Sequence, residues 1–195
     1  MIWAAFACAD VDAPPPMPPA PATPAATCPE QAPLPGGFVV FVDKSERWLG
    51  AYQDGLLATA PLGPACFPIA LGAAPEGDKA QRGDERTPVG DRRITHKNPR
   101  SRYHLSLGLD YPNTADADRA LAAGRIDAAT HARIVAADLP GRPARNDSPL
   151  GGDLFLHGGG PVPADWTDGC IAIDDAAIDW LFEVAKPGTL VRIQE

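Results

Sequence analysis

The sequence lacks any run of 18 or more apolar residues, so no segment is long enough to cross a membrane as a complete helix. Basic residues are outnumbered: 17 Lys and Arg stand against 25 Asp and Glu, which gives a formal net charge of −8. Since nucleic acids attract cationic surfaces, this balance disfavours a nucleic-acid partner. The length of 195 residues suits one domain with a sizeable core and hardly two.

Cysteine is also scarce, with only four residues, Cys8, Cys28, Cys66 and Cys170. Four are too few for a disulfide scaffold, and the sequence contains neither C-x-x-C nor H-x-x-x-H, so we expect no metal site. In an exported protein Cys28 and Cys66 could pair and leave Cys170 free. The alternative is two unrelated buried thiols, and sequence alone does not decide connectivity.

The N-terminal segment has an unusual composition. Residues 1–7 are apolar and end in Ala5-Phe6-Ala7 before Cys8, which is similar to the end of a secretory signal without its basic start. Lipidation of Cys8 and a frayed apolar terminus are the alternatives. Ten of the 23 prolines lie between Pro14 and Pro35, which favours an extended, semi-stiff tether. We predict a signal remnant and tether over 1–36 and a single domain over 37–195.

From Phe38 onward the pattern is typical of short strands separated by turns. We expect strands at 38–42, 47–52, 56–62, 67–71, 91–95, 103–107 and 190–193, helices at 115–123, 127–137 and 176–186, and a long surface loop over 73–86. Many strands and few helices predict a mainly β, β-rich α+β domain.

The most informative feature is a histidine and a cysteine at the edges of two short apolar runs. His157 follows Leu154-Phe155-Leu156 and precedes three glycines, and Cys170 lies thirteen residues later, before Ile171-Ala172-Ile173. A thiol is a strong nucleophile only as thiolate, and a neighbouring imidazole can take its proton or stabilise the anion. We therefore expect His157 to hold the sulfur charged and accessible near neutral pH in a cysteine acyl-transfer enzyme.

The run Leu156-His157-Gly158-Gly159-Gly160 is also similar to the oxyanion loop of lipases and esterases. That interpretation requires a downstream Gly-x-Ser-x-Gly, which the sequence lacks, so we reject a serine hydrolase. The segment from Lys79 to His104 carries eight Lys or Arg against three acids. Such a segment is a solvated face or a site wall that attracts substrate carboxylates.

Together these motifs resemble the L,D-transpeptidase catalytic domain, the YkuD-like family of cell-wall enzymes. Its signature, a histidine after a strand and then Ser/Thr-x-Gly-Cys, matches His157 and Thr167-Asp168-Gly169-Cys170. Supporting matches are Pro68-Ile69-Ala70-Leu71-Gly72, Thr87-Pro88-Val89-Gly90, Tyr103-His104-Leu105-Ser106-Leu107 and Pro187-Gly188-Thr189. The resemblance covers about residues 37–195 and implies a mixed β-sheet sandwich with a few short helices.

The resemblance also implies a reaction and roles for residues. Cys170 would attack the third-residue carbonyl of a peptidoglycan stem tetrapeptide, with His157 as base and then acid, and an amine or water would resolve the thioester. A carbonyl at Gly158 or Gly159 would orient the imidazole, and the Thr167-Asp168-Gly169 turn would orient the cysteine. The amides of Gly169 and Cys170 are the candidate oxyanion donors. No metal or organic cofactor is implied.

Two positions depart from the usual family pattern: an arginine usually lies two places after the cysteine, where this chain has Ala172, and a histidine often stands in place of Asp168. The chain is similar to a branch of the family that reads Asp-Gly-Cys-Ile-Ala. Candidate substrate-binding residues are Tyr103, His104, Arg86, Arg102 and Trp166. Hydrolysis of the same substrates, as by an L,D-carboxypeptidase or in release of wall-attached protein, and a non-catalytic wall-binding module remain as alternatives. We expect an exported monomer in the periplasm or cell envelope, with a membrane tether through the N-terminus as one anchoring mode.

Overall fold

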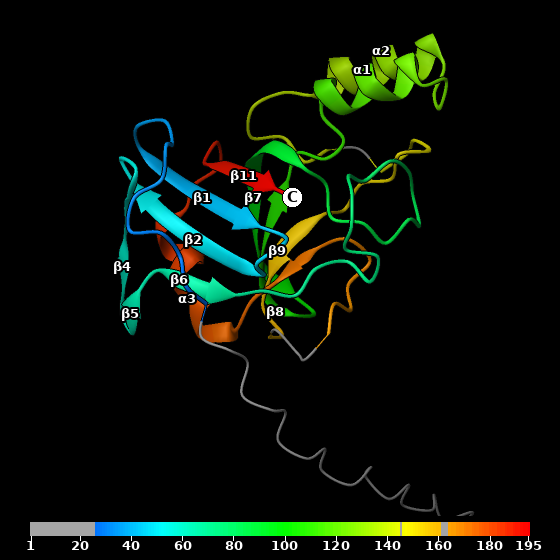
Figure 1. The fold of residues 1–195 in the computed structure, drawn as a ribbon. Coiled ribbons are helices and arrows are strands. Elements are labelled where there is room, and N and C mark those ends of the chain that lie inside the picture. Colours follow the sequence, from blue (N-terminus) through cyan, green and yellow to red (C-terminus); the bar gives the residue numbers. More distant parts are fainter. Residues whose placement is uncertain (1–25, 145, 161–163) are drawn as a thin grey trace, which may run out of the picture.

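The computed structural model describes residues 26–144, 146–160 and 164–195 (Figure 1). The predicted signal remnant, Cys8 and most of the proline-rich tether lie outside these residues. The strands are β1 (Phe38–Asp43), β2 (Trp48–Gln53), β3 (Leu56–Leu57), β4 (Thr59–Ala60), β5 (Gly63–Pro64), β6 (Cys66–Pro68), β7 (Gly90–Ser101), β8 (His104–Leu109), β9 (Phe155–His157), β10 (Ile171–Ala172) and β11 (Leu190–Gln194). The helices are α1 (Thr114–Ala122), α2 (Ala128–Ala137) and α3 (Asp175–Val184).

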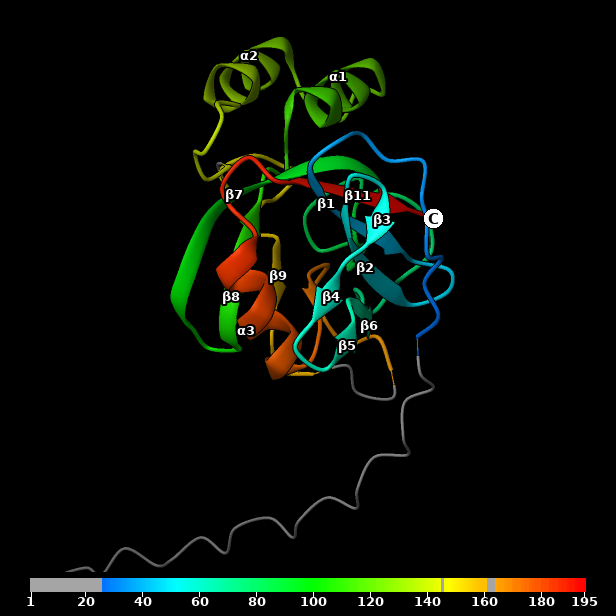
Figure 2. The same ribbon diagram turned by 90° about the vertical axis from the view of Figure 1, so that its left-hand side faces the viewer.

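The main sheet is mixed and runs in the order β10-β9-β8-β7-β11-β1-β2-β3, with β6 also paired to β2. The pairs β1–β11 and β9–β10 are parallel, and the other pairs are antiparallel. Strand β7 joins two halves of the sheet, because its residues 90–93 pair with β11 and its later residues pair with β8 (Figure 2). A bridge between Ala70 and Ala172 connects the chain after β6 with β10 at the other end. The sheet thereby brings β10, and with it the site, against the segment after β6.

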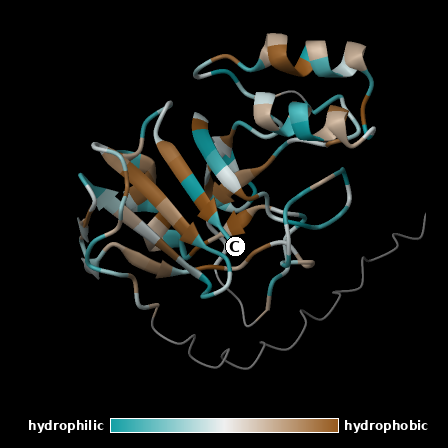
Figure 3. Cartoon of the chain, turned by 45° about the horizontal axis from the view of Figure 1, so that its top comes forward, coloured by the Kyte–Doolittle hydropathy of each residue, from teal (hydrophilic) through white to brown (hydrophobic). Residues whose placement is uncertain are grey.

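Both halves of the sheet contribute to one apolar core. Val40 and Leu49 from one half, and Leu107 and Leu156 from the other, are fully buried in the same cluster. Figure 3 shows hydrophobic residues concentrated along these strands. Helix α3 is capped by the Asp174 side chain, which accepts from Ala177 N, and it adds three buried residues, Ala177, Ile178 and Leu181. Removal of this apolar surface from water is the main force that holds the two halves together.

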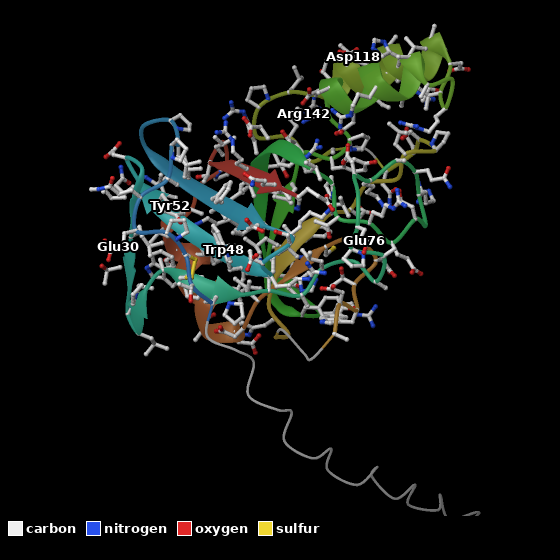
Figure 4. All side chains as sticks on the ribbon, viewed as in Figure 1. Glu30, Trp48, Tyr52, Glu76, Asp118 and Arg142 are labelled. Atoms are coloured by element: carbon white, nitrogen blue, oxygen red, sulfur yellow. A yellow bond between two sulfur atoms is a disulfide. The ribbon has the colours of Figure 1, made fainter. Side chains whose placement is uncertain are left out.

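Helices α1 and α2 form a pair that projects from one end of the sheet (Figures 1 and 4). They enclose a second, smaller cluster with Tyr111, Leu150 and Leu154. A buried ion pair joins this part to β7: Arg92 Nη2 donates to Asp116 Oδ1 at 3.0 Å, and both side chains are at most 3% exposed. Asp116 also completes the capping box at the start of α1. The cluster therefore links the helix pair to the loop that precedes β9.

The structure confirms the sheet-rich fold with short helices, and it differs from the expectations in some boundaries. Strand β7 has twelve residues and continues through Pro99, because a register shift between Asn98 and Ser101 lets the proline sit without a ladder donor. The single strand expected over 56–62 is divided into β3 and β4. Helix α3 ends at Val184, before Ala185 in extended conformation.

The described part of the predicted tether, 26–36, contacts the sheet. Cys28 forms a disulfide with Cys66 of β6, which answers the pairing that the sequence left open. The Tyr52 hydroxyl donates to Pro29 O at 3.0 Å, and Gln31 forms a bridge with Leu56. Figure 4 shows Glu30 and Tyr52 on the same side of the molecule. Within the described residues, no helix is both long and apolar enough for a membrane span.

Candidate active site

A cavity of about 650 Å³ contains both His157 and Cys170 in its wall. The strand register explains why these two residues line the same cavity. Strands β9 and β10 are parallel neighbours with Leu156 opposite Ile171 and His157 opposite Ala172, so Cys170 enters β10 beside the strand that ends in His157. The other lining residues are Lys79, Arg82, Gly83, Glu85, Tyr103, Asn146, Gly151, Gly152, Asp153, Leu154, Trp166, Thr167 and Asp168.

The imidazole of His157 is buried and its tautomer follows from one hydrogen bond. Nδ1 lies 2.6 Å from the carbonyl oxygen of Gly158, and because a carbonyl can only accept, Nδ1 carries the proton. The second nitrogen, Nε2, is then the unprotonated one in the neutral ring. This agrees with the expectation that a backbone carbonyl after the histidine orients the imidazole.

Two aromatic residues surround His157. The ring of Tyr103 stacks on the imidazole, with centroids 4.6 Å apart and planes inclined by 22°. The ring of Trp166 lies edge-on to both of these rings, with its centroid 5.7 Å from that of His157 and 5.4 Å from that of Tyr103. Tyr103 and Trp166 thus lie in the cavity wall, where the sequence placed them as candidate substrate-binding residues.

The turn that carries Cys170 is held by Thr167, which is itself buried. Its hydroxyl donates to Cys170 O at 2.7 Å and accepts from Gly169 N at 3.1 Å. Gly169 has a φ of +123°, and a Cβ there would lie 2.5 Å from Arg86 O, so only glycine fits this position. Because the Gly169 amide is engaged by Thr167, the Cys170 amide remains as the candidate oxyanion donor.

The resting charge state differs from the expected thiolate. Burial raises the pKa of the Cys170 thiol to about 11, and the nearby Asp168 and Asp153 carboxylates act in the same direction. The sulfur donates to Asp153 O at 3.8 Å, a contact that favours the protonated form. Burial lowers the pKa of His157, although its bond to Gly158 opposes this shift. The pair is therefore a neutral thiol and a neutral imidazole at pH 7, which corrects the expectation of a charged sulfur.

Three predicted substrate-binding residues lie outside the cavity wall. His104 has an exposed side chain whose Nε2 lies 2.7 Å from Asp179 Oδ1 of α3. The Arg102 guanidinium lies 5.5 Å from the centre of the Tyr103 ring. Arg86 lies beside Gly169 through its backbone carbonyl, and its side chain does not line the cavity. By contrast, Asp168 is in the wall, and Gly158 is packed closely enough that a Cβ would lie 2.9 Å from Tyr103 O.

The cavity also contains residues that sequence reasoning missed. Lys79 and Arg82 belong to the basic segment, and of its eight Lys and Arg residues only these two line the wall. Lys79 donates to Asp84 Oδ1 at 2.7 Å, whereas Arg82 donates to Asn146 O at 2.9 Å. Asn146 and 151–153 come from a stretch that offered no signal beyond turn-forming residues. Among the described residues, no group of three or more His, Cys, Asp and Glu could hold a metal ion.

Comparison with known proteins defines the class to which this site belongs. The sequence model for the L,D-transpeptidase catalytic domain, YkuD, matches residues 37–193. The chain therefore belongs to the L,D-transpeptidase catalytic domain family. A comparison with curated protein sequences finds no match.

Two solved structures share this fold. The helical cell shape determining protein Pgp2 of Campylobacter jejuni superposes with a TM-score of 0.53 at 22% identity, over 82% of this chain and 48% of that chain. Bd1075 of Bdellovibrio bacteriovorus gives a TM-score of 0.51 at 18% identity, over 82% of this chain and 48% of that one. The chain spans about half the length of these proteins, and likeness at this identity shows the fold alone.

Proposed function

We propose that this protein is a cysteine acyltransferase that acts on peptidoglycan stem peptides, an L,D-transpeptidase. Cys170 is the nucleophile and His157 is the general base and then the acid. The observation that carries the proposal is the shared cavity in which a buried, carbonyl-oriented imidazole and a cysteine at the start of β10 line one wall. The matched family supplies the substrate class.

The neutral resting pair suits a mechanism in which proton transfer accompanies attack. As the Cys170 sulfur forms a bond to the carbonyl carbon of the third stem residue, its proton passes to Nε2 of His157. The tetrahedral oxyanion collapses, the C–N bond to D-alanine breaks, and Nε2 returns the proton to the leaving amine. An acceptor amine then attacks the thioester, gives a proton to Nε2, and the sulfur leaves and regains it.

The substrate surroundings are proposed from the same wall. The Cys170 amide binds the oxyanion, for which one donor typically contributes about 3 kcal/mol to lowering the barrier. Trp166 offers flat apolar surface to peptide or sugar. The Arg82 guanidinium is a cation in the wall that a substrate carboxylate can reach. Arg82 is the candidate replacement for the family's arginine, whose position is occupied by Ala172 in this chain.

An exported location fits the disulfide between Cys28 and Cys66, since such bonds persist in oxidising compartments. We propose that the domain over 37–195 is a monomer that acts in the periplasm or cell envelope. Residues 1–36 would direct its export and hold it there, with an N-terminal membrane tether as one mode of attachment.

Mass spectrometry of the protein incubated with a disaccharide-tetrapeptide tests the proposal. We expect an acyl adduct on Cys170 that is lost in Cys170→Ala and formed at least about a hundredfold more slowly in His157→Ala. Cross-linked dimers indicate transpeptidation, and shortened tripeptides indicate hydrolysis. Binding to peptidoglycan without any adduct, unchanged after iodoacetamide, would indicate a wall-binding module and contradict the proposal.

A further inference from the structure

The β7–β8 hairpin places an aromatic ring directly on the face of the candidate base. Tyr103 lies at the tip of this hairpin, where Ser101 pairs with His104 and Tyr103 N donates to Ser101 Oγ at 3.1 Å. Its ring stacks on the imidazole of His157 at 4.6 Å. We propose that Tyr103 is a positioning residue, which keeps His157 in one orientation and shields one face of the ring from water. This inference rests on the proposed function for its catalytic meaning.

The backbone on either side of Tyr103 packs closely against the loop that follows His157. Gly158 N donates to Leu105 O at 3.1 Å, and a Cβ at Gly158 would lie 2.9 Å from Tyr103 O, so the two segments approach as closely as glycine allows. A Cβ at Gly159 would lie 3.5 Å from Tyr103 Cδ1. The loop after His157 thus packs on the same tyrosine that covers the imidazole.

The hairpin tip has its own anchor on α3. His104 adopts a φ of 67°, and its Nε2 lies 2.7 Å from Asp179 Oδ1. Both side chains are well exposed, so this pair contributes modestly. It nevertheless fixes the residue next to Tyr103, and this gives His104 a role as an anchor for the hairpin in place of the substrate contact expected from sequence.

The stack has a chemical consequence for His157. With Nδ1 committed to Gly158 O, rotation of the ring would break this bond and redirect Nε2, and a flat neighbour opposes that rotation. If the Tyr103 ring were removed, water could reach that face of His157 and solvate the imidazolium. The other charged and titratable side chains in the same wall are Cys170, Lys79, Arg82, Glu85, Asp153 and Asp168. Asp175 of α3 accepts from Gly159 N at 2.8 Å in the loop after His157.

Two substitutions at Tyr103 separate positioning from packing. Phenylalanine keeps the flat ring without the hydroxyl, and leucine keeps apolar bulk without the flat face. We expect Tyr103→Phe to retain kcat within about threefold, and Tyr103→Leu to lose on the order of tenfold to a hundredfold in kcat. In Tyr103→Leu the acid limb of the kcat/KM profile should shift to higher pH by roughly half a unit or more. Thermal unfolding of both variants reports whether the fold is intact.

A second readout does not depend on turnover. The NMR titration of His157, assigned by comparison with His157→Gln, should show its pKa raised toward the ordinary value in Tyr103→Leu and unchanged in Tyr103→Phe. An unchanged His157 titration in Tyr103→Leu, with kcat preserved and only KM raised, would make Tyr103 a substrate contact and overturn the inference. If the wild-type protein forms no adduct, the proposed function fails while the titration still decides the role of Tyr103.

Discussion

The hydroxyl of Thr167 donates to the carbonyl oxygen of Cys170 at 2.7 Å while it accepts from the amide of Gly169 at 3.1 Å. One buried side chain therefore closes the turn that delivers the sulfur. The same turn is pressed against the backbone of Arg86 at Gly169, and Thr167 also bridges to Gly72. The position of the Cys170 sulfur thus depends on a hydroxyl that is hydrogen-bonded to the backbone of its own turn.

Loss of this hydroxyl should reduce both turnover and stability. Thr167→Val keeps the shape of the side chain and removes both hydrogen bonds, so we expect kcat to fall on the order of tenfold and unfolding free energy to fall by about 1–3 kcal/mol. Thr167→Ser restores the hydroxyl and is the matched control, with nearly normal kcat. Steady-state kinetics and chemical denaturation measure the two effects. A Val variant with wild-type kcat would remove Thr167 from the positioning of Cys170.

The resting thiol should react slowly with alkylating agents at neutral pH. Since the pKa of Cys170 is raised to about 11, the thiolate fraction is small at pH 7 and grows about tenfold per pH unit below that value. Iodoacetamide labelling of Cys170, followed by mass spectrometry in a Cys8→Ser background, should therefore accelerate steadily from pH 7 to pH 10. A plateau reached near pH 7 would instead indicate a thiolate–imidazolium pair in the free enzyme.

The placement of His157 and Cys170 in one cavity could be predicted from sequence because its signal is local. His157 and Cys170 each lie at the edge of a short apolar run with glycine beside it, and two strand ends joined by a short loop tend to converge. The strands β1 and β2 and the helix α3 were predictable for the same reason, since their periodicity and turns are contained within a few neighbouring residues.

The remaining cavity wall depends on contacts between distant parts of the chain. Lys79 and Arg82 reach the site because the 73–86 loop packs against the turn at Gly169, which local patterns cannot reveal. The basic segment did not indicate which of its cations face the cavity. Arg92, for example, forms a buried ion pair with Asp116 instead. Charge along a sequence does not distinguish a cation that faces a cavity from one that holds two elements together.

Removal of one partner of that ion pair should destabilise the fold strongly, because the other charge is left buried and unpaired. In Asp116→Ala the guanidinium of Arg92 loses its buried carboxylate, and α1 loses its capping box, so we expect a loss of about 3–5 kcal/mol. The matched control is Asp118→Ala on the same helix, whose side chain is 62% exposed and pairs with His131. That change should cost less than about 1 kcal/mol. Equal midpoints of thermal unfolding for the two variants would contradict this assignment.

The disulfide between Cys28 and Cys66 should stabilise the domain without taking part in the reaction. It closes a loop with a sequence separation of 38, and restriction of the unfolded chain by such a loop is worth about 4 kcal/mol. A Cys28→Ser, Cys66→Ser double variant should therefore unfold at a lower temperature, while Cys8→Ser should not change the midpoint. Because hydrogen bonds between Ala70 and Ala172 hold the chain after β6 against β10 independently of the disulfide, kcat of the double variant should stay near the wild-type value below its unfolding transition. A large loss of kcat in the folded double variant would show that the anchored segment 26–36 helps to shape the site.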